Sequence, residues 1–141
     1  MYKHILIPTD GSPLANKGAK AGIALARKLG AKVTGFCAIE ELQPIYVEGY
    51  AFNQKEIDIF EQRTLEAAQK RVAAIGGLAK AAGVPFTAAV TTDSTPYEGI
   101  VAIAKKRKCD LIFMASHGRN GLSRLIMAAS RRRCWRIPNS R

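Results

Sequence analysis

Two polar segments, each placed directly after an apolar run, hold the residue types that could do chemistry. The first is PTDGS (residues 8–12), which ends the run YKHILIP, and the second is SHGRNG (residues 116–121), which follows DLIFMA. An aspartate at such a strand end can bind a ribose hydroxyl or an adenine edge, or it can cap the next helix. Glycines at such a place let backbone N–H groups approach an anion. The segments predict a nucleotide site, with ordinary turns as the plainer alternative.

The elements that must position these segments alternate between strand and helix. Apolar runs predict strands over residues 2–8, 32–39, 86–91 and 110–116, and helical spacing predicts three helices between them. Ser12 and Pro13 suit the start of the first helix, and Gly30 and Gly83 suit the ends of the first two. This order predicts one domain over residues 1–141, an α/β fold in which an open parallel sheet is covered by helices on both faces.

The expected topology also predicts where a ligand binds. In such Rossmann-like sheets the ligand lies beyond the carboxyl ends of the strands, where the strand order reverses. We therefore expect the ends of the first, second and fourth strands to surround one crevice. On the first strand, we expect His4 to face solvent. The long helix over residues 54–82 has a predicted buried stripe, which contains Leu65, Ala68, Val72, Ile75 and Ala79.

Other kinds of chemistry find little support in the composition. Cys37, Cys109 and Cys134 stand apart, which argues against a disulfide framework and against a zinc site. Since no catalytic triad, metal cluster or pair of carboxylates falls near the crevice, we expect no efficient enzyme; weak hydrolysis of a bound nucleotide would depend on His117. No apolar run approaches the ~20 residues that span a bilayer, and residues 1–10 lack a cleavage site. We expect a cytoplasmic protein without a membrane partner.

The segments ILIPTDGS and ASHGRNGLSRLIM, and the order of elements between them, resemble the universal stress protein family over residues 1–127. The resemblance implies a five-stranded parallel fold of the adenine nucleotide alpha hydrolase-like type, ATP binding (with Mg²⁺), a homodimer and a role in the general stress response. The family's nucleotide motif reads Gly, two residues, Gly, nine residues, Gly, then Ser or Thr. The matching positions here are Ala115, Gly118, Ala128 and Ala129, so one of the three glycines is kept.

The resemblance also implies a set of site residues. Asp10 would contact the nucleoside, and the end of the second strand would meet the adenine. A Cβ at Ala115 or Ala128 would crowd the phosphates, and the hydroxyl lost at Ala129 removes a hydrogen bond worth ~1 kcal/mol. We therefore expect adenine binding to be kept better than phosphate binding. The expected nucleotide-binding residues are Pro8, Thr9, Asp10, Ala38, Ile39, Met114, Ala115, Ser116, His117, Gly118, Arg119, Gly121, Ala128 and Ala129.

The residues after Met127 depart from the family pattern, which would continue with Gly-Ser, a helix and a fifth apolar strand. We therefore predict the strand order 3-2-1-4 with the fifth strand missing, which would leave the fourth strand at an edge and remove the family's usual dimer contact. One added base after the Met127 codon gives a frame that can read Gly-Ser-Val-Thr-Gln-Lys. We hypothesise a one-base deletion near residue 128, which sequencing of the gene would test.

The positive charge leaves two further hypotheses open. The net charge is +11, and five arginines of the tail account for almost half of it, so that +6 remains on the rest of the chain. Arg131–Arg136 with Trp135 could bind nucleic acid through phosphates and stacking, although most of the charge is read as solvated surface. The other hypothesis is a stress protein that does not use ATP and acts through protein contacts, which the alanines of the motif favour.

Overall fold

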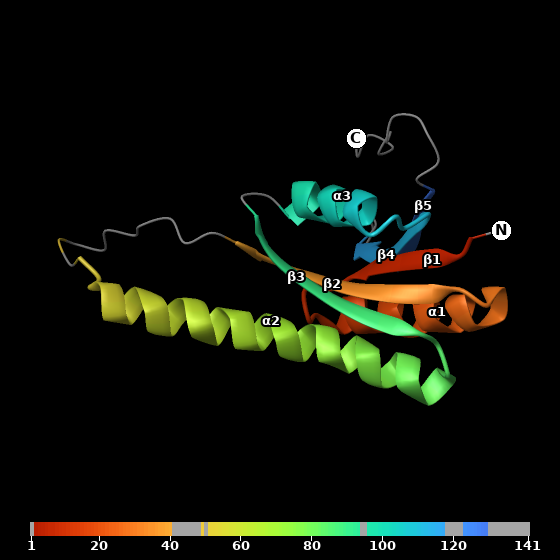
Figure 1. Cartoon of the computed structure of the whole chain (residues 1–141), viewed down its shortest axis with the longest axis horizontal. Coiled ribbons are helices and arrows are strands. Elements are labelled where there is room, and N and C mark those ends of the chain that lie inside the picture. The colour runs from red at the N-terminus through yellow and green to blue at the C-terminus, as the bar shows by residue number, and fades with distance from the viewer. Residues whose placement is uncertain (1, 41–48, 50, 94–95, 118–122, 130–141) are drawn as a thin grey trace.

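A computed structural model of the chain describes residues 2–40, 49, 51–93, 96–117 and 123–129, and Figure 1 shows them as one sheet with helices on both faces. The elements follow the predicted order. They are β1 (His4–Pro8), α1 (Pro13–Leu29), β2 (Lys32–Glu40), α2 (Gln54–Ala82), β3 (Phe86–Asp93), α3 (Pro96–Lys106), β4 (Leu111–His117) and β5 (Ser123–Ala129).

The strand order is β3-β2-β1-β4-β5, and the first four strands run parallel. The predicted order 3-2-1-4 is therefore confirmed. The prediction that a fifth strand is missing, which would leave β4 at an edge, is wrong. The chain turns back after β4, and β5 pairs with β4 antiparallel from the pair His117 and Ser123 to the pair Leu111 and Ala129. Five residues separate the two strands, a length that hairpin loops commonly have.

The helix ends follow local capping chemistry. The Ser12 hydroxyl accepts a hydrogen bond from the Ala15 N–H at 3.1 Å, with Pro13 at the first helical position of α1. Gly30 ends this helix in the left-handed conformation, and Gly83 does the same for α2. These three predicted boundaries are confirmed. The start of α2 adds a capping box between Asn53 and Glu56.

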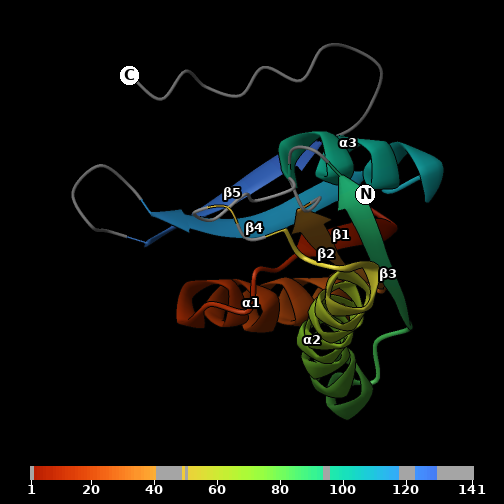
Figure 2. The same ribbon diagram turned by 90° about the vertical axis from the view of Figure 1, so that its left-hand side faces the viewer.

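The two faces of the sheet bury separate clusters. Helices α1 and α2 lie on one face and α3 on the other (Figure 2). Successive residues of β1 alternate between them, because Ile5 and Ile7 pack under α1 and α2, whereas Leu6 packs under α3 with Phe36 and Ile112. Both faces of the central strands are therefore covered, as a parallel sheet requires.

Helix α2 is longer than the sheet that it covers. Its 29 residues extend over about 43 Å at 1.5 Å per residue, and Figure 1 shows its first half projecting past the sheet. Its buried residues, Ala68, Val72, Ile75 and Ala79, begin at the middle of the helix and continue toward its end. Leu65 was predicted in this stripe but is 41% exposed, and it belongs to the half of α2 that projects past the sheet.

His4 is buried, contrary to the prediction that it faces solvent. Its Nε2 atom lies 2.7 Å from the Thr34 hydroxyl oxygen, which in turn lies 2.9 Å from the Thr87 hydroxyl oxygen. The Asp110 carboxylate accepts hydrogen bonds from the backbone N–H groups of Lys3 and His4 and so fixes the start of β1. Because β2 lies beside β1 in the sheet and β3 beside β2, the hydroxyl groups of Thr34 and Thr87 form a polar network with the buried imidazole.

The buried imidazole predicts a pH-dependent stability. Burial and the nearby Lys32 charge hold the pKa of His4 below its ordinary value of about 6.5, against the opposing Asp110 charge. The unfolded chain therefore takes up a proton at a higher pH than the folded chain does, so stability falls as the pH drops below about 6.5. We expect urea unfolding to show a loss between about pH 7.5 and 5.5 that is smaller in His4→Gln. An equal loss in both proteins would contradict this origin.

Candidate functional site

The candidate site lies where β1 and β4 separate. Their ladder joins Ile5 to Leu111 and Leu6 to Ile112, whereas the ladder between β1 and β2 continues to Pro8. The chain order runs from β1 outward through β2 to β3 on one side and resumes at β4 on the other. This is the reversal point at which open α/β sheets bind ligands.

The β1 exit loop, residues 9–12, is held by its own hydrogen bonds. The Thr9 N–H donates to the Phe36 carbonyl oxygen at 2.8 Å, which ties the loop to β2. The Gly11 N–H donates to the Thr9 hydroxyl at 3.1 Å, and the Ser12 N–H donates to the Asp10 carboxylate at 2.8 Å. These N–H groups are thus already paired within the protein.

Asp10 presents an exposed carboxylate at this loop. The hydrogen bonds from Ser12 hold the pKa of Asp10 below its ordinary value, and the nearby Arg71 charge acts in the same direction. The carboxylate is therefore ionised at neutral pH and can accept hydrogen bonds from a ligand. Two roles were predicted for Asp10, ligand binding and capping of the next helix. The cap of α1 is Ser12, and Asp10 lies outside the helix and accepts a hydrogen bond from the Ser12 N–H.

Ala115 stands where the family motif has its first glycine, and its methyl group is directed toward α1. A Cβ placed on Gly18 of α1 would come within 2.9 Å of the Ala115 Cβ and 3.0 Å of its backbone nitrogen. Ala115 and Gly18 are therefore packed in direct contact where β4 meets α1. The expected crowding of phosphates by this Cβ is not what the contact shows, because the methyl group lies against the helix.

The other predicted site residues fall into three groups. Four of them are half-buried. Pro8 lies at the end of β1, Ala38 and Ile39 lie near the end of β2, and Met114 lies in the middle of β4. Ser116 and His117 end β4, opposite Arg124 and Ser123 of β5. Gly118, Arg119 and Gly121 lie outside the described residues.

Ala128 and Ala129 are not brought to this edge. They pair with Ile112 and Leu111, at the beginning of β4, whereas the site lies beyond the end of that strand. In the described part of the chain, a strand rather than a helix follows β4. The second half of the expected phosphate motif therefore has no counterpart beside Asp10.

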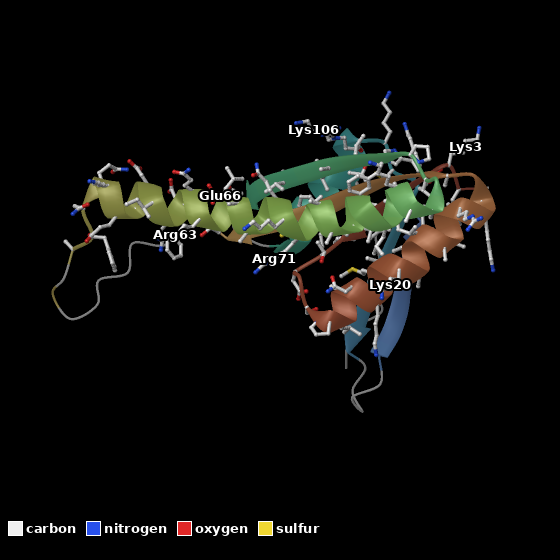
Figure 3. The ribbon with its side chains drawn as sticks, turned by 90° about the horizontal axis from the view of Figure 1, so that it is seen from below. Lys3, Lys20, Arg63, Glu66, Arg71 and Lys106 are labelled. Carbon is white, nitrogen blue, oxygen red and sulfur yellow. The ribbon has the colours of Figure 1, made fainter. Side chains whose placement is uncertain are left out.

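Two side chains at the site were not found by sequence reasoning. Arg71 of α2 lies over the β1 exit loop, where a Cβ placed on Gly11 would come within 2.8 Å of its Nε atom, and Figure 3 shows it on α2 beside that loop. Cys37 of β2 is buried, which raises the pKa of its thiol, while a hydrogen bond from Arg71 opposes the rise. The only sequence signal for Arg71 is its place beside Val72 in the buried stripe of α2.

Comparisons with known proteins decide the family. The model of the universal stress protein family matches residues 1–136. This chain belongs to the universal stress protein family. It is 32% identical to a universal stress protein of Thermus aquaticus over 92% of this chain and 88% of the other, and 27% identical to one of Methanocaldococcus jannaschii over 92% and 73%.

The solved structures agree on the fold. A universal stress protein from Burkholderia pseudomallei superposes with a TM-score of 0.69 at 19% identity, covering 82% of this chain and 83% of the other. In the part of this universal stress protein that the structure describes, no helix is long and apolar enough to cross a bilayer. In the same described ranges, no three His, Cys, Asp or Glu side chains gather as a metal site would need.

Proposed function

We propose that this universal stress protein binds an adenine nucleotide, ATP above all, at the carboxyl ends of β1, β2 and β4. The observation that carries the proposal is the ionised, exposed Asp10 at the point where the ladder between β1 and β4 ends. Its carboxylate would accept a hydrogen bond from a ribose hydroxyl. The half-buried Ala38 and Ile39 would offer the adenine an apolar surface.

The proposed role is that of a nucleotide-responsive binding protein in the stress response and not of a fast enzyme. Asp10 is engaged by Ser12 and has no imidazole partner in the described contacts. The chain would thus bind and orient the nucleotide, and Mg²⁺ would arrive with the ATP. We propose the cytoplasm as its location because Cys37 and Cys109 are buried as thiols and not joined in a disulfide, which suits a reducing compartment.

The test compares Asp10→Asn with the wild-type chain by calorimetric titration of Mg-ATP. Asparagine keeps an acceptor for the Ser12 N–H but removes the charge, so we expect an affinity about tenfold lower, the effect of losing about 1.4 kcal/mol. Asp58→Asn on the projecting half of α2 is the matched control and should bind as the wild type does. Equal affinities in all three proteins would place the nucleotide elsewhere, and absence of binding in the wild type would refute the function.

A second candidate function is action through protein contacts, which the projecting half of α2 favours. Ile59, Phe60 and Leu65 are 45%, 53% and 41% exposed there. A group of exposed large apolar side chains is typical of interaction surfaces. We propose that this surface pairs two copies of the chain, and sedimentation velocity of the full chain would measure the pairing. Nucleotide that remains bound through purification would distinguish the first function from this one.

A further inference from the structure

We infer that Arg71 of α2 recognises the anionic part of the bound nucleotide, so that the crevice selects nucleotides over nucleosides. The inference rests on the proposed nucleotide binding and adds a residue to it from an element outside both sequence motifs. It follows from where the positive groups of the site lie and from which N–H donors are already used.

The position of Arg71 is fixed by its neighbours. Val72 is 1% exposed and packs against the sheet with Cys37 and Ala68, so α2 is anchored at this turn. The Arg71 side chain then crosses the Gly11 backbone, because a Cβ on Gly11 would lie 2.8 Å from Nε, 2.9 Å from Cδ and 3.0 Å from Cγ. Gly11 has φ +80° and no side chain, which leaves the space that the arginine occupies.

The β1 exit loop offers an anion few backbone donors. The N–H groups of Thr9, Gly11 and Ser12 donate within the protein, as described above. The first turn of α1 adds little, because Pro13 has no N–H and the N–H groups of Ala15 and Asn16 both donate to Ser12. Residues 9–16 therefore do not hold a phosphate as a glycine-rich loop does, where unpaired N–H groups surround it.

The strand β4 does not supply the missing charge in the described residues. Ala128 and Ala129 lie opposite the beginning of β4, because the described segment after β4 is the antiparallel strand β5. Among the described residues, a positive group for the phosphates would then come from a side chain. The guanidinium of Arg71 has five N–H donors, and its planar shape matches a phosphate in two parallel hydrogen bonds.

The charge arrangement suits this role. Arg71 lies near the Asp10 carboxylate and the Cys37 thiol. The carboxylate accepts hydrogen bonds, and the guanidinium beside it donates them. A nucleotide has both requirements, since its ribose hydroxyls donate and its phosphates accept. Figure 3 shows Lys20 on α1, whereas Arg63 lies on α2 together with Arg71; the role inferred for Arg71 rests on its position beside Gly11.

The experiment titrates the wild type, Arg71→Ala, Arg71→Lys and the neighbouring control Lys70→Ala with Mg-ATP and with adenosine, which carries no phosphate. We expect Arg71→Ala to lose about tenfold or more in ATP affinity and to keep adenosine affinity within about twofold, because a charge-assisted bidentate pair exceeds 1.4 kcal/mol. Arg71→Lys should recover part of the loss, and Lys70→Ala, which removes the same net charge, should bind both ligands as the wild type does.

Each other outcome overturns the inference in its own way. If Arg71→Ala loses adenosine as strongly as ATP, the arginine only holds the β1 exit loop in place. If it keeps both affinities, Arg71 takes no part while the proposed nucleotide binding stands. If the wild type binds neither ligand, the proposed function fails and the inference fails with it. Thermal unfolding of all four proteins shows whether an affinity loss comes from a damaged fold.

Discussion

Replacement of Phe36 by alanine is expected to lower the free energy of unfolding by about 3–5 kcal/mol, the usual cost of removing a buried phenyl ring. Phe36 is 1% exposed and packs with Leu6 and Ile112 beneath α3. It also pairs with Pro8, and its carbonyl oxygen accepts the Thr9 N–H at 2.8 Å. The cavity would therefore open next to the strand end that carries the site.

The measurement is urea denaturation followed by circular dichroism, with Phe60→Ala as the matched control. Phe60 is 53% exposed on the projecting half of α2, so its loss should change the stability of the monomer by less than about 0.5 kcal/mol. A cost below about 1.5 kcal/mol for Phe36→Ala would mean that the site can collapse around the gap, contrary to the close packing of the two layers. We expect its nucleotide affinity to fall as well, because the β1 exit loop depends on this strand pair.

The sequence predicts best those features that depend on neighbouring residues. Ser12, Gly30 and Gly83 mark helix ends through capping contacts within a few residues, and all three boundaries are confirmed. The alternation of strands with helices predicts the parallel sheet and its right-handed crossovers, and the observed strand order agrees with the fold that the family resemblance implies. The position of the crevice follows from that order.

The features that were wrong depend on distant partners. His4 lies on a strand whose two faces are both covered, so its burial depends on β2 and β3 and not on its neighbours in sequence. Leu65 continues the apolar stripe of α2 past the end of the sheet, which no local pattern reveals. Segment 123–129 is apolar enough for either element, and it becomes a strand because β4 lies within reach of a hairpin.

Arg71 shows the same limit at the candidate site. The chain places Lys70 and Arg71 side by side, and nothing in the sequence distinguishes their roles. Helix packing does so, because burial of Val72 turns the adjacent Arg71 across Gly11, some sixty residues earlier in the chain. A glycine in a turn motif is thus needed for two reasons, its positive φ and the side chain that crosses it.

Two glycines in helices are expected to respond in opposite ways to the same substitution. Gly18→Ala places a Cβ 2.9 Å from the Ala115 Cβ and 3.0 Å from its backbone nitrogen, whereas a Cβ on Gly77 of α2 meets no atom within 4 Å. Alanine favours a helix over glycine by about 1 kcal/mol, so Gly77→Ala should be stabilised by up to that amount. Gly18→Ala should lose about 2 kcal/mol, because β4 and α1 must move apart.

Thermal and urea unfolding of both variants would measure this difference of about 3 kcal/mol. The double variant Gly18→Ala with Ala115→Gly removes the contact between the methyl groups but keeps the contact with the backbone nitrogen, so we expect it to recover part of the loss. A Gly18→Ala protein as stable as Gly77→Ala would contradict the close contact of α1 and β4. The close contact is the evidence that the Ala115 methyl group is directed toward α1. That result would therefore restore the earlier expectation that this methyl group crowds the phosphates.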